Sequence, residues 1–327
     1  MPKKRVLSGI QPSGKLHLGN LIGALENWVK MQDEYDCIFE IADLHALTTG
    51  YDNTKNFKNM IFDVALDLLS VGIDPAKCTL FIQSAVPEHS ELHLLFSMIT
   101  PLPWLERVPT YKSKIEELKE KDLGTYGFLG YPVLQAADIL IYRADMVPVG
   151  QDQLPHLELT REIARRFNYF YGEVFPQPKD VLTKVPVLPG LDGRKMSKSY
   201  GNTIAISDSP EVLQAKVMSM VTDPARVKKS DQGHPEICPV FAYQEIFNKN
   251  QTPEICKRCA AADIGCVECK KILAEVLKNY LEPIWMKRAK LVQDKKKVIK
   301  ILEAGAKKAQ QIARKTLKQA KEAMGLQ

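Results

Sequence analysis

The chain has 327 residues, of which 45% are hydrophobic and 26% charged, a composition typical of a globular protein with one large domain or two ordinary ones. Its first residues lead directly into a strand-like run, without the apolar segment of a signal peptide. No apolar run is long enough to span a membrane. These features argue against a membrane partner and predict a cytoplasmic protein.

The net charge of +6 is distributed unevenly. Residues 285–327 contain thirteen lysines and arginines against three acidic residues, so the rest of the chain is slightly acidic. A basic tail on an acidic body is typical of proteins with a polyanionic partner, most often a nucleic acid. A solvated, lysine-rich helix face is the competing interpretation, and charge alone slightly favours it.

Strand-like and helical patterns alternate through the first half of the chain. The runs in chain order are strand-like at 5–10, helical at 16–32, strand-like at 37–41, helical at 53–71 and strand-like at 78–82. This alternation is typical of βαβ units and predicts an α/β fold with a Rossmann-like parallel sheet. Ligands of such sheets bind at the carboxyl ends of the strands, where residues 11–20 and 43–49 would lie.

The middle of the chain is less regular. Residues 105–127 form a charged insertion, and residues 128–142 form an apolar, strand-like run around a single acid, Asp138. A helix is predicted at 153–171. Proline and glycine then cluster at 176–193, which predicts a long loop.

Beyond Ser199 strand-like runs nearly vanish, and we place the domain change there. The expected organisation is a sheet domain at 1–199, a helical domain at 200–295 and a basic C-terminal helix at 296–327. Apolar residues recur at helical spacing in that last segment, at Val298, Ile301, Leu302, Ile312, Leu317 and Met324. They predict an amphipathic helix that packs back on the body of the protein.

Residues 11–20 read Gln-Pro-Ser-Gly-Lys-Leu-His-Leu-Gly-Asn and lie between a predicted strand and a predicted helix. Small residues let the backbone approach a ligand, and a new helix directs unpaired N–H groups and partial positive charge toward it. His17 and Asn20 are predicted to share a helix face, from which both could donate hydrogen bonds to one anion. The pattern favours a phosphate site, with an ordinary strand-to-helix turn as the alternative.

Residues 195–199 read Lys-Met-Ser-Lys-Ser and follow Asp-Gly-Arg. Two lysines in a loop of small residues can surround a polyphosphate and neutralise charge that develops on a leaving group. Together with His-Leu-Gly-Asn at 17–20, this loop resembles the paired HIGH and KMSKS signatures of class I aminoacyl-tRNA synthetases.

Three segments between these signatures narrow the resemblance. Residues 131–142, 149–153 and 158–168 look like bacterial-type tryptophanyl-tRNA synthetase, and the likeness covers nearly the whole chain. Gln151 stands where the family often has glutamate, and Leu7 where some members have an aromatic residue. Neither departure touches the signatures.

The resemblance implies that L-tryptophan and ATP form tryptophanyl-adenylate and pyrophosphate, and that tryptophan then passes to tRNA(Trp). This reaction requires no nucleophilic side chain, so catalysis would rest on positioning and charge stabilisation, with Mg²⁺ bound to the phosphates. The implied catalytic residues are His17, Lys195 and Lys198. The implied ATP-binding residues are Gln11, Pro12, Ser13, Gly19, Asn20, Gly150, Gln151, Asp152, Val187, Lys195, Met196, Ser197, Lys198 and Ser199.

Asp138 is the residue expected to select the amino acid. A carboxylate in an apolar run needs a donor, and the indole N–H is a donor without acceptor capacity. An aspartate paired to a local backbone N–H is the alternative. The resemblance places Tyr131, Gln135, Gln153 and His45 in the same site. For His45, the close alternative is a buried core histidine whose hydrogen bonds are satisfied within the protein. No role is assigned to the remaining histidines, His89, His93, His156 and His234.

Five of the seven cysteines lie between residues 238 and 269, and Cys256, Cys259, Cys266 and Cys269 form two CxxC pairs. In a reducing compartment this spacing indicates metal rather than disulfides, and zinc and iron–sulfur fit it equally. A subset of the resembled family carries a [4Fe-4S] cluster, and its pattern matches Cys238, Cys259, Cys266 and Cys269. Zinc, no metal, or Cys256 in place of Cys238 stay open.

Three other functions compete with this interpretation. A tyrosyl-tRNA synthetase shares both signatures but needs a site for a phenolic hydroxyl, and the first strand offers Val6 and Leu7 instead. A small HxGH-type nucleotidyltransferase has no use for the helical half and the basic tail. An iron–sulfur protein that only binds RNA leaves both ATP signatures unexplained. By resemblance, residues 200–295 would bind the tRNA anticodon, and the protein would be a homodimer.

Overall fold

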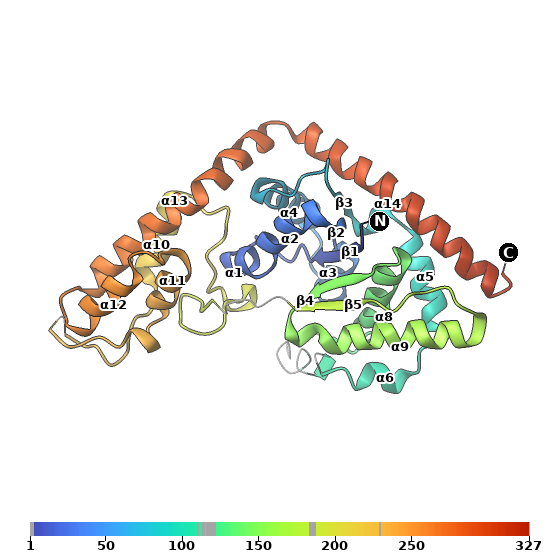
Figure 1. The fold of residues 1–327 in the computed structure, drawn as a ribbon, viewed down its shortest axis with the longest axis horizontal. Coiled ribbons are helices and arrows are strands. Elements are labelled where there is room, and N and C mark those ends of the chain that lie inside the picture. The colour runs from blue at the N-terminus through green and yellow to red at the C-terminus, as the bar shows by residue number, and fades with distance from the viewer. Residues whose placement is uncertain are drawn as a thin grey trace.

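A five-stranded sheet lies at the centre of the computed structural model, which describes residues 3–109, 111, 112, 115, 122–182, 188–228 and 230–326 (Figure 1). Its strands are β1 (Arg5–Ile10), β2 (Asp36–Ile41), β3 (Thr79–Ile82), β4 (Met146–Val149) and β5 (Lys179–Leu182). They lie in the order β3-β2-β1-β4-β5, and all neighbours are parallel. The predicted Rossmann-like α/β sheet is confirmed. The strand order reverses between β1 and β4, where ligands of such sheets bind.

The first half of the chain supplies helices to both faces of this sheet. They are α1 (Leu18–Asn20), which continues through a π-helical turn (Leu21–Leu25) into α2 (Glu26–Glu34), then α3 (Asp43–Gly50), α4 (Phe57–Val71), α5 (Glu88–Ser97), α6 (Leu102–Glu106), α8 (Tyr126–Ile141) and α9 (Leu154–Tyr171). Val6 and Phe39 pack into one core with α2 and α4, whereas Leu7 and Ile38 pack into another with α5, α8 and α9. Successive strand residues therefore point to opposite layers.

The sequence-based boundaries are right for the first three strands to within one residue, but two predictions are wrong. The run around Asp138 is the helix α8 and not a strand. Most of this helix is buried, so it lacks the polar face that reveals a helix in a sequence. The predicted loop at 176–193 contains β5, an edge strand with mostly exposed residues. The charged insertion at 105–127 lies partly outside the described residues.

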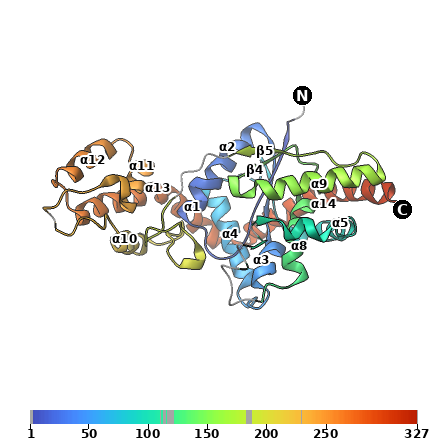
Figure 2. The same ribbon diagram turned by 90° about the horizontal axis from the view of Figure 1, so that it is seen from below.

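Beyond residue 199 the described chain is helical, as predicted. The helices are α10 (Pro210–Ser219), α11 (Pro239–Phe247), α12 (Thr252–Ala260), α13 (Cys266–Gln293) and α14 (Lys295–Ala323). The helices α10, α11 and α12 gather at one end of α13, apart from the sheet (Figures 1 and 2). The other end of α13 packs on α4, where Arg288 donates to Asp63 and Asp67. The helix α13 therefore joins the two parts of the molecule.

The helix α14 turns back and lies along the edge strand β3 (Figure 1). Val298, Leu302 and Leu317 are buried as the sequence pattern predicts, but the rest of the buried face is mostly alanine, at positions 306, 309, 313 and 320. A Cβ on Gly305 would lie 1.8 Å from the Leu80 carbonyl oxygen, so only glycine permits this approach. The helix therefore covers a strand edge that would otherwise be open to pairing.

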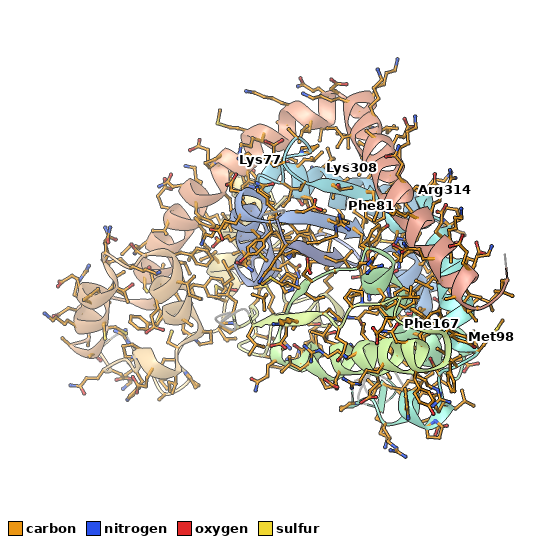
Figure 3. All side chains as sticks on the ribbon, turned by 45° about the vertical axis from the view of Figure 1, so that its right-hand side comes forward. Lys77, Phe81, Met98, Phe167, Lys308 and Arg314 are labelled. Atoms are coloured by element: carbon orange, nitrogen blue, oxygen red, sulfur yellow. The ribbon has the colours of Figure 1, made fainter. Side chains whose placement is uncertain are left out.

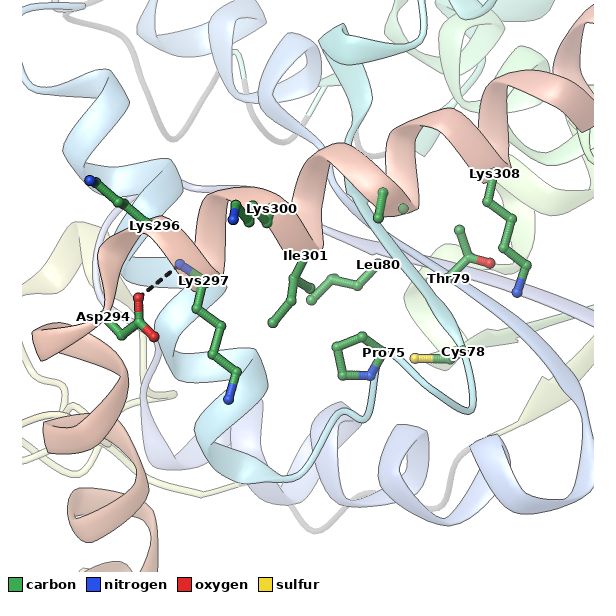
Figure 4. Close-up of a pocket in the computed structure, with 12 residues that line it drawn as sticks. Pro75, Cys78, Thr79, Leu80, Asp294, Lys296, Lys297, Lys300, Ile301 and Lys308 are labelled. Atoms are coloured by element: carbon green, nitrogen blue, oxygen red, sulfur yellow. Dashed lines mark hydrogen bonds between the residues drawn. The ribbon is translucent and has the colours of Figure 1, made fainter.

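Some basic side chains of α14 face neighbouring elements: Lys308 lines a cavity beside β3, and Arg314 donates to Glu88 of α5. Lys308 and Arg314 project from this helix, whereas Phe81 of β3 lies inside the protein (Figure 3). A cavity of about 640 Å³ lies between part of α14 and the turn that leads into β3, and Lys297 and Lys308 are among its lining residues (Figure 4). Within the part of the chain that the structure describes, no helix combines the length and apolarity needed to cross a bilayer.

Candidate active site

A cavity of about 380 Å³ lies where the strand order reverses, a volume within the range of roughly 300–1,000 Å³ for small-molecule sites. Residues at or just after the ends of β1, β2 and β4 line it, together with residues of α8 and α9. All five residues predicted to bind the amino acid line this cavity, namely His45, Tyr131, Gln135, Asp138 and Gln153. Three predicted nucleotide residues, Gln11, Asn20 and Gly150, line it as well.

Asp138 on α8 is 1% exposed and accepts hydrogen bonds from three side chains. Its Oδ2 accepts from His45 Nε2 at 2.7 Å, and its Oδ1 accepts from His89 Nδ1 at 2.5 Å. Gln83 Nε2 donates to both oxygens at 2.9 Å. Burial opposes ionisation, but the hydrogen bonds from His45 and His89 outweigh it and hold the pKa of Asp138 well below its usual range. The carboxylate is thus ionised and fixed.

The alternative of a backbone partner for Asp138 is wrong, because its partners are these three side chains. Gln83 is fully buried, and its Oε1 accepts from the backbone N–H groups of Leu44 and His45. His89 also bonds to the Tyr142 hydroxyl at 2.6 Å through Nε2. Both residues fix the orientation of Asp138.

A second group of polar side chains lies at the α9 side of the cavity. The His156 ring bonds through Nε2 to the Tyr131 hydroxyl at 2.9 Å and through Nδ1 to Gln153 Oε1 at 2.9 Å. His156 is 3% exposed and lines the cavity itself. It therefore positions two of the predicted amino-acid residues.

Sequence reasoning missed four residues of this cavity or its support: Glu40, Gln83, His89 and His156. His89 and His156 lie on helices, and Asp138, Tyr142 and Tyr131, to which they hydrogen-bond, are distant in the chain. A signal existed for Glu40, which is an acid inside the otherwise apolar run 37–41. A buried acid in a central strand of a parallel sheet is rarely structural without a partner.

Lys198 brings the two signature loops into contact. Its Nζ donates to the Gly14 carbonyl at 3.0 Å and lies 3.4 Å from Ser13 Oγ. Burial lowers the pKa of this lysine to about 8, although Asp67 acts in the opposite direction. At neutral pH the side chain is still mostly charged and lies directly at the predicted phosphate loop.

His17 and Asn20 are engaged with each other rather than pointing together at open space. The Asn20 backbone N–H donates to His17 Nδ1 at 3.3 Å, and the His17 backbone N–H donates to Asn20 Oδ1 at 3.1 Å. This reciprocal cap corrects the expectation of two parallel donors. Burial, and then the charge of Lys198, lower the pKa of His17 to about 4. The neutral ring accepts at Nδ1, so its proton is on Nε2 and one donor is left for a ligand.

Asn202 holds the second signature loop, and the sequence did not reveal it. Its Oδ1 accepts from the Ser197 N–H at 2.8 Å, and its Nδ2 donates to Asp192 and to the Lys195 carbonyl. Just beyond it, Ile204 O accepts from the Leu18 N–H and the Ile206 N–H donates to Leu16 O. Residues 202–206 are therefore tied to the first signature. A side chain at Gly190 would overlap Asn202.

The remaining predicted nucleotide residues are placed less tightly. Met196 and Pro12 are buried. The sulfur of Met196 lies 3.7 Å from the position that a Cβ on Gly19 would occupy. Gln151 and Asp152 lie in an exposed turn after β4. Lys195 is exposed, and among the described residues its side chain makes no hydrogen bond or ion pair. Val187 lies outside the described residues, and of Ser199 only the backbone is described.

The four predicted metal ligands converge in the helical part. Cys238 caps α11, Cys259 lies on α12, and Cys266 and Cys269 form the first turn of α13. Burial raises the pKa of Cys269 to about 11, and the neighbouring thiols of the other three cysteines raise it further. Burial and two of these thiols also raise the pKa of Cys259.

The described residues contain one group of three potential metal ligands whose atoms lie within 4.8 Å of one another, and it is Glu40, His89 and Asp138 rather than the cysteines. The cysteine sulfurs are therefore spaced more widely than tetrahedral zinc requires, since a Zn–S distance of about 2.3 Å places sulfurs about 4 Å apart.

Comparisons with known proteins agree with this geometry. A protein-family model described as "tRNA synthetases class I (W and Y)" matches residues 2–282. The chain belongs to this family of class I synthetases. A tryptophan–tRNA ligase of Thermotoga maritima is 53% identical over 325 residues, which cover 98% of this chain and 99% of that protein. A tryptophan–tRNA ligase of Aquifex aeolicus is 44% identical and is covered over 100% of its length.

The class I synthetase fold extends along the whole chain. A crystal structure of tryptophanyl-tRNA synthetase from Campylobacter jejuni, complexed with ADP and tryptophan, superimposes with a TM-score of 0.89 at 36% identity. The match covers 98% of this chain and 100% of that one. The sheet, the signature loops and the helical part therefore all have counterparts in this class I synthetase.

Proposed function

We propose that this protein is a tryptophan–tRNA ligase. It forms tryptophanyl-adenylate and pyrophosphate from L-tryptophan and ATP, and then transfers the tryptophanyl group to tRNA(Trp). One observation carries this function. Gln11 and Asn20 of the first signature line the same cavity as Asp138, at the point where the strand order reverses between β1 and β4. The ligase name shared by relatives at 53% and 44% identity supports it.

Tyrosine is the less favoured amino acid. The first strand contributes Leu7 to the cavity, together with Ser8, Gly9 and Ile10, and no tyrosine that could meet a phenolic hydroxyl. The apolar walls formed by Leu7, Ile139 and Val147 suit a large aromatic ring. A polar end with Asp138 suits a ring that carries a single N–H donor.

The nucleotide is expected along the two signature loops. Lys198 is charged and lies against Gly14, so it is placed to meet negative charge that develops on the leaving pyrophosphate. His17 offers a neutral Nε2–H donor to a phosphate oxygen. Lys195 is exposed and free to approach the same phosphates from the other side. Gly150, Gln151 and Asp152 would contact the adenosine ribose, where a carboxylate accepts hydroxyl donors.

The remaining expected ATP contacts are Gln11, Pro12, Ser13, Gly19, Asn20, Val187, Met196, Ser197 and Ser199. Catalysis then consists of holding the tryptophan carboxylate in line with the α-phosphate and stabilising the charge that forms. Mg²⁺ would bind chiefly to the phosphates, because the signature loops provide hydroxyl, amide and amine groups rather than carboxylates. It would neutralise phosphate charge.

The amino-acid end is expected to work through fixed polar groups. Asp138 sets the choice of tryptophan at the indole end, with His45 as its cavity-facing partner. Tyr131, Gln135 and Gln153 would receive the ammonium group, since hydroxyl and amide oxygens accept its protons. The His156 hydrogen bonds to Tyr131 and Gln153 keep these two acceptors in place.

Cys238, Cys259, Cys266 and Cys269 are expected to hold a [4Fe-4S] cluster. The donor set fits, because four neighbouring thiols can hold a four-iron cluster. Gln244 Nε2 lies 3.6 Å from Cys269 Sγ, and Arg226 Nη1 lies 3.9 Å from Cys259 Sγ, so two donors support the sulfurs. The cluster would join α11, α12 and α13 and thereby shape the helical part.

Metal content tests this assignment. Protein purified without oxygen should be brown and contain about four irons per chain, which Cys259→Ser should abolish. Cys256→Ser is the matched control and should keep the iron. Colourless protein with one zinc per chain, or loss of iron in Cys256→Ser, would contradict the assigned cluster or its ligand set.

The helical part at 200–295 is expected to bind the tRNA anticodon, and the lysines of α14 to contact the tRNA backbone. The protein is expected to act in the cytoplasm as a homodimer, and sedimentation at micromolar concentration tests the dimer.

The test of the function itself is amino-acid-dependent exchange of pyrophosphate into ATP. Exchange that requires tryptophan supports the proposal, whereas exchange with tyrosine, with another substrate, or with none contradicts it.

A further inference from the structure

Asp67 on α4 is a fully buried acid that does not line the active-site cavity. Its Oδ1 accepts from Arg288 Nε of α13 at 2.8 Å, and its Oδ2 has no hydrogen-bond partner within the described part of the chain. Arg288 Nη2 also donates to Asp63 Oδ1 at 2.9 Å, and the Asp63 side chain is 45% exposed. Because burying a carboxylate costs solvation, two apolar side chains would join α4 to α13 at least as well. The buried charge of Asp67 therefore calls for a use beyond packing.

The backbone of Leu16, in the loop at 11–20, lies between two contacts that both lead to α13. Its carbonyl accepts from the Ile206 N–H at 2.9 Å, and the Ile206 carbonyl accepts from Trp285 Nε1 at 2.9 Å. Its N–H lies close enough to Asp67 to stabilise the charged form of that carboxylate. Trp285 and Arg288 are three residues apart and so share a face of α13. One face of α13 thus supports Leu16 from both sides of its backbone.

Lys198 reaches the same loop from the second signature. Its Nζ donates to the Gly14 carbonyl at 3.0 Å, two residues before Leu16. The negative charge of Asp67 raises the pKa of Lys198, whereas burial of the lysine lowers it more, to about 8. His17 is the other titratable group beside this lysine, and with a pKa of about 4 it is neutral at pH 7. Among the described residues, Asp67 is therefore the acid whose charge supports the ammonium group of Lys198.

The charge of Asp67 depends in turn on Arg288. Burial raises the pKa of Asp67 to about 6, and the charge of Asp63 adds to this rise. The hydrogen bond and charge of Arg288, and then the Leu16 N–H, act in the opposite direction. At pH 7 the carboxylate is thus mostly ionised. Without Arg288, burial would be opposed chiefly by one backbone N–H, so Asp67 would be protonated at neutral pH and its support of Lys198 would be lost.

We propose that Asp67 is a positioning residue for the ATP site, which connects Arg288 of α13 to the loop at 11–20 and to Lys198. This inference rests on the proposed function and deepens it, because Lys198 is the lysine expected to meet charge on the leaving pyrophosphate. Asp67 acts through Lys198 and Leu16 rather than by touching a substrate. Since α13 also carries Cys266 and Cys269 at its other end, the helical part is joined to the ATP site by this route.

Chemical labelling measures the ionisation of Lys198 without relying on catalysis. Trace acetylation with acetic anhydride over a range of pH, read by peptide mass spectrometry, gives the pH midpoint at which the Lys198 amine becomes reactive. In the wild type this midpoint should lie at about 8. Asp67→Asn removes the charge at nearly constant shape and should lower the midpoint by about one pH unit. Arg288→Met leaves Asp67 without its partner and should shift the midpoint in the same direction.

Asp63→Asn is the matched control, since it removes the exposed partner of Arg288 and leaves the contact with Asp67 intact. Its midpoint should stay within about 0.3 pH units of the wild type, because an exposed charge is screened by solvent. If Asp67→Asn is poorly folded, Arg288→Met decides, since it keeps the buried residue unchanged. An unchanged midpoint in the folded variants, or an equal shift in Asp63→Asn, would overturn the inference.

Pyrophosphate exchange connects this charge to catalysis. In Asp67→Asn the value of kcat/KM for ATP should begin to fall at a correspondingly lower pH. In a Lys198→Arg background the same change should no longer move the pH profile, because arginine stays charged throughout. A shift that persists there would show that Asp67 acts by another route and would contradict the inference. Wild-type protein without tryptophan-dependent exchange would contradict the proposed function instead, and the labelling result would stand apart from it.

Discussion

The nucleotide side and the amino-acid side of this site are built in different ways. The nucleotide side consists of loops, residues 11–20 and 195–199, which meet through Lys198 and leave Lys195 exposed. The amino-acid side consists of buried groups on α8, α9 and β2, and Asp138 there is held by hydrogen bonds from His45, Gln83 and His89. A loop can follow charge that moves during a reaction, whereas a rigid polar network can reject a wrong ring.

The difference also appears in the titrating groups. On the nucleotide side burial lowers the pKa values of Lys198 and His17, to about 8 and about 4. On the amino-acid side the two carboxyl groups diverge, with the pKa of Asp138 lowered and that of Glu40 raised. The nucleotide side therefore holds a lysine that titrates near neutral pH. The amino-acid side holds one carboxyl group, Asp138, whose ionised form is favoured and another, Glu40, whose protonated form is favoured. Four measurements can break or sharpen this contrast.

The largest effect is expected for Lys198→Ala. Removing a cation that meets developing charge should slow adenylate formation about 100- to 1,000-fold, while the KM for ATP changes less than about fivefold. Single-turnover formation of tryptophanyl-adenylate measures the step directly. Lys195→Ala is the comparison variant and should be milder, because the exposed Lys195 side chain makes no hydrogen bond or ion pair to the described residues. A wild-type rate in Lys198→Ala would remove this lysine from the mechanism.

Asp138→Ala should lower kcat/KM for tryptophan at least tenfold and leave the KM for ATP nearly unchanged. The change removes the acceptor of three buried donors, so it should also reduce the free energy of unfolding by roughly 1–3 kcal/mol. Steady-state exchange at varied tryptophan and urea denaturation measure the two effects. Wild-type tryptophan kinetics in a folded variant would contradict the role of Asp138, and a parallel rise in the KM for ATP would contradict the separation of the two sides.

The pH dependence follows from the lowered pKa of Lys198. With a pKa of about 8, the side chain is mostly charged at pH 7 and mostly neutral at pH 9. The value of kcat/KM for ATP should therefore fall about tenfold between these pH values, since that constant reports the free enzyme. Lys198→Arg keeps its charge throughout and should show a flatter profile. An equal decline in both proteins would assign the titration to another group.

The smallest effect is expected for Asn202→Ala. Its side chain holds the Ser197 N–H, Asp192 and the Lys195 carbonyl, so its loss should loosen the loop and lower the rate of adenylate formation about three- to tenfold. The KM for tryptophan should be unchanged if the two sides are independent. A change in the KM for tryptophan as large as the rate effect would show that the loop also shapes the amino-acid side.

Much of the nucleotide side was predictable because its residues are contiguous in the chain. The glycines and the strand-to-helix transition near His17 are local features, as are the two lysines of 195–199. The reciprocal cap of His17 and Asn20 was not foreseen, because the geometry of a helical turn allows a shared face as readily as mutual hydrogen bonds. The hold of Asn202 on the loop was equally invisible, since its partners are set by how the loop folds back.

The amino-acid side was predictable only through resemblance. Asp138 was placed in the right site but on the wrong element, because a buried helix shows no polar face in its sequence. Gln83, His89 and His156 gain their roles from hydrogen bonds between neighbouring elements on one face of the sheet, whose residues are distant in the chain. Glu40 was overlooked as one residue of an apolar strand.

By itself the sequence determined the βα rhythm, the parallel sheet, the paired signatures and the cysteine spacing, because each depends on short-range periodicity or on contiguous residues. Only the tertiary structure decided that Lys198 reaches Gly14, that α14 lies against β3 through Gly305, and that Glu40 faces Asp138. These contacts depend on how distant segments pack, and packing is fixed by shape and burial across the whole chain rather than by any local pattern.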